Sequence, residues 1–183
     1  MHTPIPTIIE IFQTRGTEAY GSEAVNQLEH ALQCASMAVD CGSPASLVSA
    51  ALLHDIGHII HDDQLPANDE GDLDDSHEDR AHPWLLEHFG PAVADPVRLH
   101  LAAKRYICSV DADYVHSLSP TSLKSYYDQG GNMTDDERAA FESESYFHDA
   151  VTLRRWDDLG KIPGLSTPDI DFFVPYLEKS LCL

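Results

Sequence analysis

The sequence Leu52-Leu53-His54-Asp55-Ile56-Gly57-His58 ends an apolar run with a histidine that is directly followed by an aspartate. An imidazole and a carboxylate from neighbouring residues can bind one metal ion together, and the two oxygens of the carboxylate can bridge to a second ion. Because adjacent His and Asp residues also occur by chance, a metal site here requires further ligands from other segments of the chain.

The segment that carries this sequence has the periodicity of a helix. Ser43-Pro44 supplies an N-cap followed by proline at the first helical position. Leu47, Ala51, His54 and His58 then recur every three or four residues, so they fall on one helical face. We expect that face to change from hydrophobic to metal-binding at its carboxyl end.

The remaining segments also favour helices, and strand signals are scarce. Ser22 is the predicted N-cap of a helix that runs to about Asp40 and carries His30 beside its apolar stripe. The acidic segment 61–75 is expected to be a surface loop. Further helices are predicted around 8–12, over 77–89, from 91 with a kink or break at Pro96, from a cap-like start at 119–122, from a capping box at 134–137 to about 143, over 146–158, and over 168–180 on the outside. The chain is therefore predicted to be an all-α helical bundle.

Length and composition limit the classes of function. The 183 residues are expected to form a single domain with a substantial core. A formal net charge of −20 argues against nucleic-acid binding and against an anionic membrane surface, although a local basic pocket can still bind a phosphate-bearing substrate. The sequence contains no apolar run of about 20 residues and no signal-peptide pattern, so we expect a cytoplasmic protein. Four cysteines without a CxxC pair are expected to be reduced and mostly buried: Cys34, Cys41, Cys108 and Cys182.

Six side chains that can bind a metal are expected to point inward from five predicted helices or helix starts: His30, His54, Asp55, His77, His100 and Asp157. Nitrogen and oxygen ligands without a thiolate suit iron, manganese or zinc, as one ion or as two that share a carboxylate, and argue against a structural zinc site. Spacing does not choose between Asp157 and Asp158. The other histidines are expected to be surface or hydrogen-bonded residues: His2, His61, His82, His88, His116 and His148.

The order His30, His54-Asp55, Asp157 resembles the HD-domain superfamily, most of whose members are metal-dependent phosphohydrolases. Five segments are more closely similar to its organophosphonate-cleaving oxygenases: Tyr20 to His30, Ala50 to His58, His100 to Tyr106, Gln129 to Gly131, and Arg154 to Asp157. The resemblance covers about residues 18–158. It implies an HD-domain helical bundle over residues 1–183, with a mixed-valent pair of iron ions (Fe2+/Fe3+) that uses O2 to cleave a carbon–phosphorus bond.

The resemblance also implies a role for each matching residue. One iron is held by His30, His54, Asp55 and Asp157, and the second by Asp55, His77 and His100. Tyr20 binds the second iron until substrate arrives, and Glu23 faces the substrate ammonium. The phosphonate is bound by a basic cluster of His58, Lys104 and Arg154, with hydrogen bonds from Ser122 and Gln129. The chemistry of Arg and Lys agrees with this, because both bind oxyanions and both are scarce in this acidic chain.

The implied substrate is a small hydroxyphosphonate, (1-hydroxy-2-aminoethyl)phosphonate or its N-trimethyl analogue, which would yield phosphate with glycine or glycine betaine. The negative charge and the rings of Tyr20 and Tyr106 favour the trimethyl form, although a primary ammonium would be attracted as well. One alternative is a phosphohydrolase that acts on a nucleotide or small phosphoester without oxygen. Another is a catalytically silent module that binds a partner, against which the presence of all six candidate ligands argues. The sequence does not indicate an oligomeric state.

Overall fold

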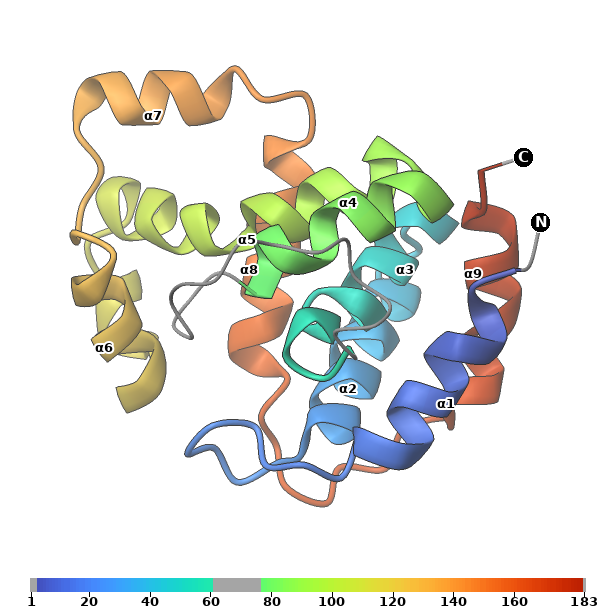
Figure 1. Cartoon of the computed structure of the whole chain (residues 1–183). Coiled ribbons are helices and arrows are strands. Elements are labelled where there is room, and N and C mark those ends of the chain that lie inside the picture. Colours follow the sequence, from blue (N-terminus) through green and yellow to red (C-terminus); the bar gives the residue numbers. More distant parts are fainter. Residues whose placement is uncertain (1–2, 61–76, 183) are drawn as a thin grey trace.

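The computed structural model describes residues 3–60 and 77–182, and of residues 77–79 it describes the backbone alone (Figure 1). Within these ranges the chain forms helices and no sheet, which confirms the all-α prediction. The α-helices are α1 (Ile5–Arg15), α2 (Gln27–Asp40), α3 (Ala45–Leu53), α4 (His77–Phe89), α5 (Pro91–Val110), α6 (Pro120–Asp128), α7 (Asp135–Glu142), α8 (Phe147–Leu159) and α9 (Val174–Ser180). Short 3-10 helices are η1 (Ile56–His58), η3 (Tyr114–Ser117) and η4 (Ile170–Phe173).

Helix α3 lies at the centre of the main hydrophobic core. Its residues are apolar and small, and Leu47 to Leu53 are all buried. A helix that is apolar on every side must be covered on every side, and α3 packs against α2, α5, α8 and α9 (Figure 1). The central position of α3 therefore delivers the residues that follow it, His54 and Asp55, into the interior. None of the described helices is both long enough and apolar enough to cross a membrane.

Two predicted helix boundaries near the candidate ligands are wrong. Helix α2 begins at Gln27 instead of beside Ser22, because Asn26 and Glu29 form a capping box in which each side chain accepts the other's backbone N–H, at 2.8 and 2.9 Å. Helix α3 ends at Leu53, because Asp55 has φ −106° and ψ 12° and the chain tightens into η1. His58 consequently does not continue the face of α3, and it is exposed.

The caps predicted at Ser119 and Thr134 are confirmed, and the latter forms a capping box with Glu137. Of the kink or break predicted at Pro96, the break is absent, since α5 runs through this residue as one helix of 20 residues. Pro96 is only its sixth residue and is buried, so a single intrahelical hydrogen bond is lost against the packing that α5 gains. The acidic loop predicted at 61–75 lies outside the described residues.

The C-terminal segment covers α3 from the edge of the bundle and adds three buried side chains to the core: Ile170, Phe173 and Leu177. A single outer helix was expected over 168–180, but η4 precedes α9 and both bury apolar side chains. Helix α9 packs on α3 because Phe173 and Leu177 point inward and are both 0% exposed. The predicted outer position agrees with the place of α9 at the edge of the bundle (Figure 1), but spacing alone did not show which face of this short segment meets α3.

Two adjacent phenylalanines test this packing. Phe173→Ala should lower the free energy of unfolding by about 3–5 kcal/mol, because it leaves a cavity in the core. Phe172 is 46% exposed, and Phe172→Ala is the matched control, with an expected change within about 0.5 kcal/mol. Urea denaturation followed by circular dichroism measures both. Equal losses for the two variants would contradict the described packing of α9.

Candidate functional site

Three buried histidines meet where α2, the end of α3 and α5 converge: His30, His54 and His100. The Nδ1 atom of each lies against a backbone carbonyl oxygen, that of Gly160 at 2.8 Å, of Ala51 at 2.9 Å and of Val97 at 2.6 Å respectively. A carbonyl oxygen only accepts hydrogen bonds, so Nδ1 of each ring carries a proton, and in the neutral form of the ring Nε2 has the lone pair that a metal ion binds. Histidines that bind metal ions are oriented in this way in proteins.

The Nε2 atoms of all three histidines face the carboxylate of Asp55. Asp55 Oδ2 lies 3.5 Å from His30 Nε2 and 3.2 Å from His54 Nε2, whereas Asp55 Oδ1 lies 3.6 Å from His100 Nε2. The two imidazole nitrogens of His30 and His54 are 3.1 Å apart. Neighbouring ligands around one metal ion are separated by about 3 Å when each ligand is about 2.1 Å from the ion. The donor set and its spacing fit a cation, and the two oxygens of Asp55 face different histidines, as a bridging carboxylate requires.

The second carboxylate of the cluster is Asp157, at the end of α8. Its Oδ1 lies 3.4 Å from His30 Nε2, while Asp158 accepts hydrogen bonds from Tyr114 and Arg154. The choice that spacing left open is therefore made by the direction of the two side chains: Asp157 belongs to the histidine cluster. Arg154 Nη1 donates to Asp157 Oδ2 at 2.7 Å. The guanidinium of Arg154 therefore bridges Asp157 and Asp158.

The carboxylates produce a field that favours positive charge. Burial by itself lowers the pKa of His54, but the charge of Asp55, with a smaller effect of Asp157, raises it to about 9. Burial by itself raises the pKa of Asp157, but Arg154, His30 and Lys161 hold it well below its ordinary value. Asp157 can thus remain ionised in the interior, and a metal cation placed beside it is stabilised by its charge.

Cys34 lies next to the histidines, and its thiol is protonated. Its sulfur belongs to a group with nitrogens of His30 and His54 in which all atoms lie within 4.8 Å of one another. Burial raises the pKa of this thiol well above its ordinary value, and Asp157 and Asp55 raise it further. The protonated thiol donates to the carbonyl of Trp156 at 3.5 Å. Because metals bind the thiolate, Cys34 could bind an ion only after losing this proton, and its Sγ lies 3.9 Å from Nδ1 and from Nε2 of His30. All four cysteines are free, and Cys41 and Cys182 are exposed.

A turn before α2 brings Tyr20 and Glu23 to the cluster. The backbone bridge between Ala19 and Asn26 closes this turn. The ring of Tyr20 stacks on His30 with centroids 4.1 Å apart, and its hydroxyl donates to Asp157 Oδ1 at 3.4 Å. Burial raises the pKa of Tyr20, and the two nearby aspartates raise it further, so the phenol keeps its proton. Glu23 Oε1 accepts from Ser119 Oγ at 2.5 Å.

The predicted phosphonate-binding residues lie in different surroundings. Lys104 is 1% exposed and donates to Ser125 Oγ at 2.8 Å, which also accepts from Gln129 Nε2 at 3.2 Å. Ser122 is buried and accepts from Arg154 Nη2 at 3.3 Å. His58 is exposed on η1. The side chain of His77, the remaining candidate ligand, lies outside the described residues.

Sequence reasoning missed Lys161. Its Nζ lies 3.2 Å from Ser122 Oγ, 3.5 Å from Glu23 Oε1 and 3.8 Å from Asp157 Oδ1. Two features of the sequence could have indicated it. Basic residues are scarce, with only 11 Lys and Arg in the chain, and Lys161 lies four residues after Asp157, the spacing of one helical turn.

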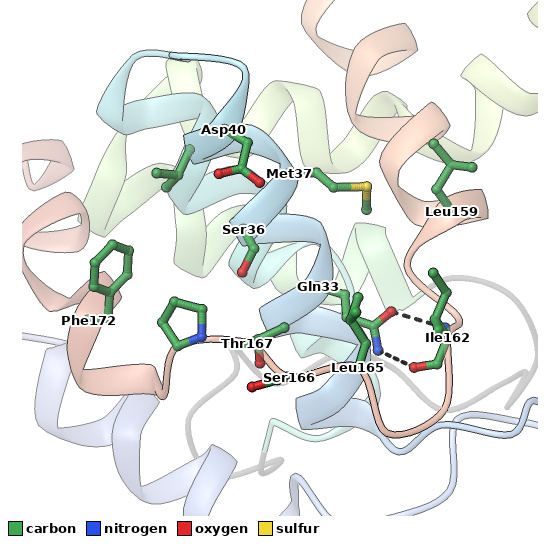
Figure 2. A pocket seen from close by; sticks show the side chains of 12 residues that line it. Gln33, Ser36, Met37, Asp40, Leu159, Ile162, Leu165, Ser166, Thr167 and Phe172 are labelled. Carbon is green, nitrogen blue, oxygen red and sulfur yellow. Dashed lines mark hydrogen bonds between the residues drawn. The ribbon is translucent and has the colours of Figure 1, made fainter.

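An apolar groove of about 490 Å³ lies apart from this site, between α2 and the segment 159–172 (Figure 2). Its lining residues include Leu159, Ile162, Leu165 and Phe172, all exposed, and none of the predicted site residues. Gln33 crosses from α2 to this segment and binds both backbone polar groups of Ile162 (Figure 2). The groove is thus separate from the polar cluster, and Gln33 joins its two sides, α2 and the segment that contains Ile162.

Several curated proteins are similar to almost the whole chain, two of them named as phosphonate dioxygenases, whereas no family model matches it. The hydroxymethylphosphonate dioxygenase of Gimesia maris is 44% identical over 177 residues, which cover 97% of this chain and 88% of that protein. The glycine-betaine-forming 1-hydroxy-2-(trimethylamino)ethylphosphonate dioxygenase of Leisingera caerulea is 38% identical over 170 residues, which cover 92% of this chain and 86% of that protein.

The position of Arg154 between two carboxylates predicts a large effect on stability. Arg154→Met should lower the free energy of unfolding by about 3–5 kcal/mol, because it removes the cation that pairs with both Asp157 and Asp158 in the interior. The neighbouring Arg155 is exposed, so Arg155→Met is the control and should change stability by less than about 0.5 kcal/mol. Urea denaturation of both variants measures the difference. An unchanged free energy of unfolding in Arg154→Met would contradict the ion-pair arrangement.

Proposed function

Because the chain belongs to the phosphonate dioxygenase family, whose members are oxidoreductases of the carbon–phosphorus bond, we propose that its histidine and aspartate cluster is a di-iron site that cleaves a small 1-hydroxyphosphonate with O2. The observation that supports this most is the arrangement of three histidine Nε2 atoms around the two oxygens of Asp55. An arrangement in which one carboxylate serves two groups of donors is that of a two-metal site.

In this proposal, His30, His54, Asp55 and Asp157 hold one iron, and Asp55, His77 and His100 hold the second. Iron bound there supplies a Lewis acid for the oxygens of the substrate and the redox chemistry that O2 requires. The protein keeps His30, His54 and His100 in the correct tautomer through the carbonyls of Gly160, Ala51 and Val97. It also excludes water from these three histidines and from Asp55 and Asp157, since all five are buried.

Other residues orient the substrate. Lys104 is a buried, compact cation whose hydroxyl and amide neighbours Ser125 and Gln129 suit the oxygens of a phosphonate. The hydroxyl of Tyr20 donates a hydrogen bond to Asp157, and the tyrosine can move away from Asp157 when the substrate binds. Arg154 is engaged by Asp157 and Asp158, and this favours a role in positioning Asp157 over direct binding of the phosphonate. His58 and Ser122 complete the proposed binding set.

The substrate class follows from the chemistry of the reaction. A hydroxyl on the carbon next to phosphorus lets the hydroxyl and phosphonate oxygens bind one ion together. Oxidation at that carbon then yields inorganic phosphate and a carboxylic acid. For hydroxymethylphosphonate, one O2 gives formate and phosphate with all atoms balanced. The amino and N-trimethyl compounds give glycine and glycine betaine in the same way.

The decisive experiment is phosphate release from three synthetic compounds by iron-loaded protein, in air and under strict anaerobiosis. The compounds are hydroxymethylphosphonate, (1-hydroxy-2-aminoethyl)phosphonate and its N-trimethyl analogue. We expect phosphate from at least one compound in air and none without O2. Release of phosphate from nucleotides under anaerobiosis, with no release from the three phosphonates, would show a phosphohydrolase instead.

Metal content gives an independent test of the ligands. The protein loaded with iron should contain two ions per chain, and Asp55→Ala should lose most of both because it serves both sites. His77→Ala should lose the second ion and keep the first. His116→Ala removes an exposed histidine far along the chain and should keep both. Elemental analysis measures iron, and circular dichroism shows whether each variant is folded. Full iron content in Asp55→Ala would rule out the proposed site.

A further inference from the structure

We propose that Lys161 determines substrate specificity: its ammonium lies where a cationic substituent of the substrate would bind, so this chain acts on a hydroxyphosphonate without a cation, of which hydroxymethylphosphonate is the smallest. This inference rests on the proposed function and deepens it. It differs from the expectation drawn from the sequence, where the acidic surroundings favoured the N-trimethyl substrate.

The contacts of Lys161 are those that would recognise a substrate ammonium. Its Nζ lies 3.5 Å from the carboxylate of Glu23, 3.2 Å from the hydroxyl of Ser122, and 5.6 Å from the centroid of the Tyr20 ring. A carboxylate, a hydroxyl and an aromatic face together form a typical cation site. The same Nζ lies 3.8 Å from Asp157 Oδ1, which places it beside the metal cluster. The protein therefore supplies its own cation to this part of the site.

The backbone around Lys161 is held on both sides. Gly160 accepts a hydrogen bond from His30 Nδ1 at 2.8 Å, and Ile162 exchanges two hydrogen bonds with the buried amide of Gln33, at 2.8 and 3.0 Å (Figure 2). A Cβ at Gly160 would lie 2.6 Å from the sulfur of Cys34, so only glycine permits this close approach. The direction of Lys161 into the site is thus built into the fold and does not depend on a flexible surface chain.

The energetic consequence is discrimination against cationic substrates. The side chains of Lys161 and Glu23 are only 12% and 15% exposed, so their attraction is weakly screened by solvent. A substrate ammonium could reach Glu23 only by displacing Lys161 or by lying next to it. Displacement breaks a partly buried ion pair, and proximity places two like charges together. A neutral substituent avoids both costs.

Lys161→Gln tests the inference, with Lys179→Gln as the control that removes one exposed positive charge elsewhere. We expect the wild-type protein to favour hydroxymethylphosphonate over both ammonium compounds by at least about tenfold in kcat/KM. In Lys161→Gln this preference should fall by about tenfold or more, mainly through a lower KM for the ammonium compounds. Lys179→Gln should keep the wild-type preference. Lys161→Arg retains a cation and should keep most of the wild-type preference for hydroxymethylphosphonate.

Anaerobic calorimetry of the same compounds provides a readout that does not depend on turnover. Tighter binding of the ammonium compounds to Lys161→Gln than to wild type would support the inference. An equal loss of affinity for all three compounds would overturn it, because Lys161 would then bind the phosphonate that they share. A wild-type preference for an ammonium compound would overturn it as well. Absence of phosphate release from every compound contradicts the proposed function, whereas the calorimetric comparison still decides the role of Lys161.

Discussion

The arrangement of the helices depends on one interaction, the contact of the buried Asp55 carboxylate with the Nε2 atoms of three histidines. A charge removed from water is costly unless opposite charges or hydrogen-bond donors surround it. Three helical segments must therefore deliver their imidazoles to one point, and α3 must be apolar enough to carry Asp55 to the centre. The Arg154 guanidinium likewise compensates the charges of Asp157 and Asp158, with which it forms ion pairs.

The three histidines reach the correct tautomer by two routes. His54 and His100 use carbonyls three residues earlier in the chain, those of Ala51 and Val97, so the helix itself orients them. His30 instead uses the carbonyl of Gly160, which is 130 residues away. The segment after α8 therefore has two functions: it orients a candidate ligand through Gly160 and, one residue later, presents Lys161 to the site.

Charge is distributed unevenly over this chain. A net charge of −20 describes the whole sequence, yet Lys104 and Arg154 are buried and Lys161 is nearly so. Two of these three cations, Arg154 and Lys161, lie beside the buried carboxylate of Asp157, while most of the described acidic residues remain in contact with water. A site for an oxyanion is in this way compatible with a strongly acidic protein, because short-range contacts in a low-dielectric interior outweigh a screened surface field.

The helical class, the caps at Ser119 and Thr134 and most of the candidate ligands were predictable from the sequence, because periodicity and capping are local and a buried polar residue in an apolar stripe is conspicuous. The structure brings His30, His54, Asp55, His100 and Asp157 together as expected. Local patterns did not show that α3 ends before His58, which face of α9 meets α3, that Asp157 and not Asp158 faces the histidines, or that Lys161 pairs with Glu23. Each of these depends on which side chains of distant segments meet, and that is determined when the helices pack around α3.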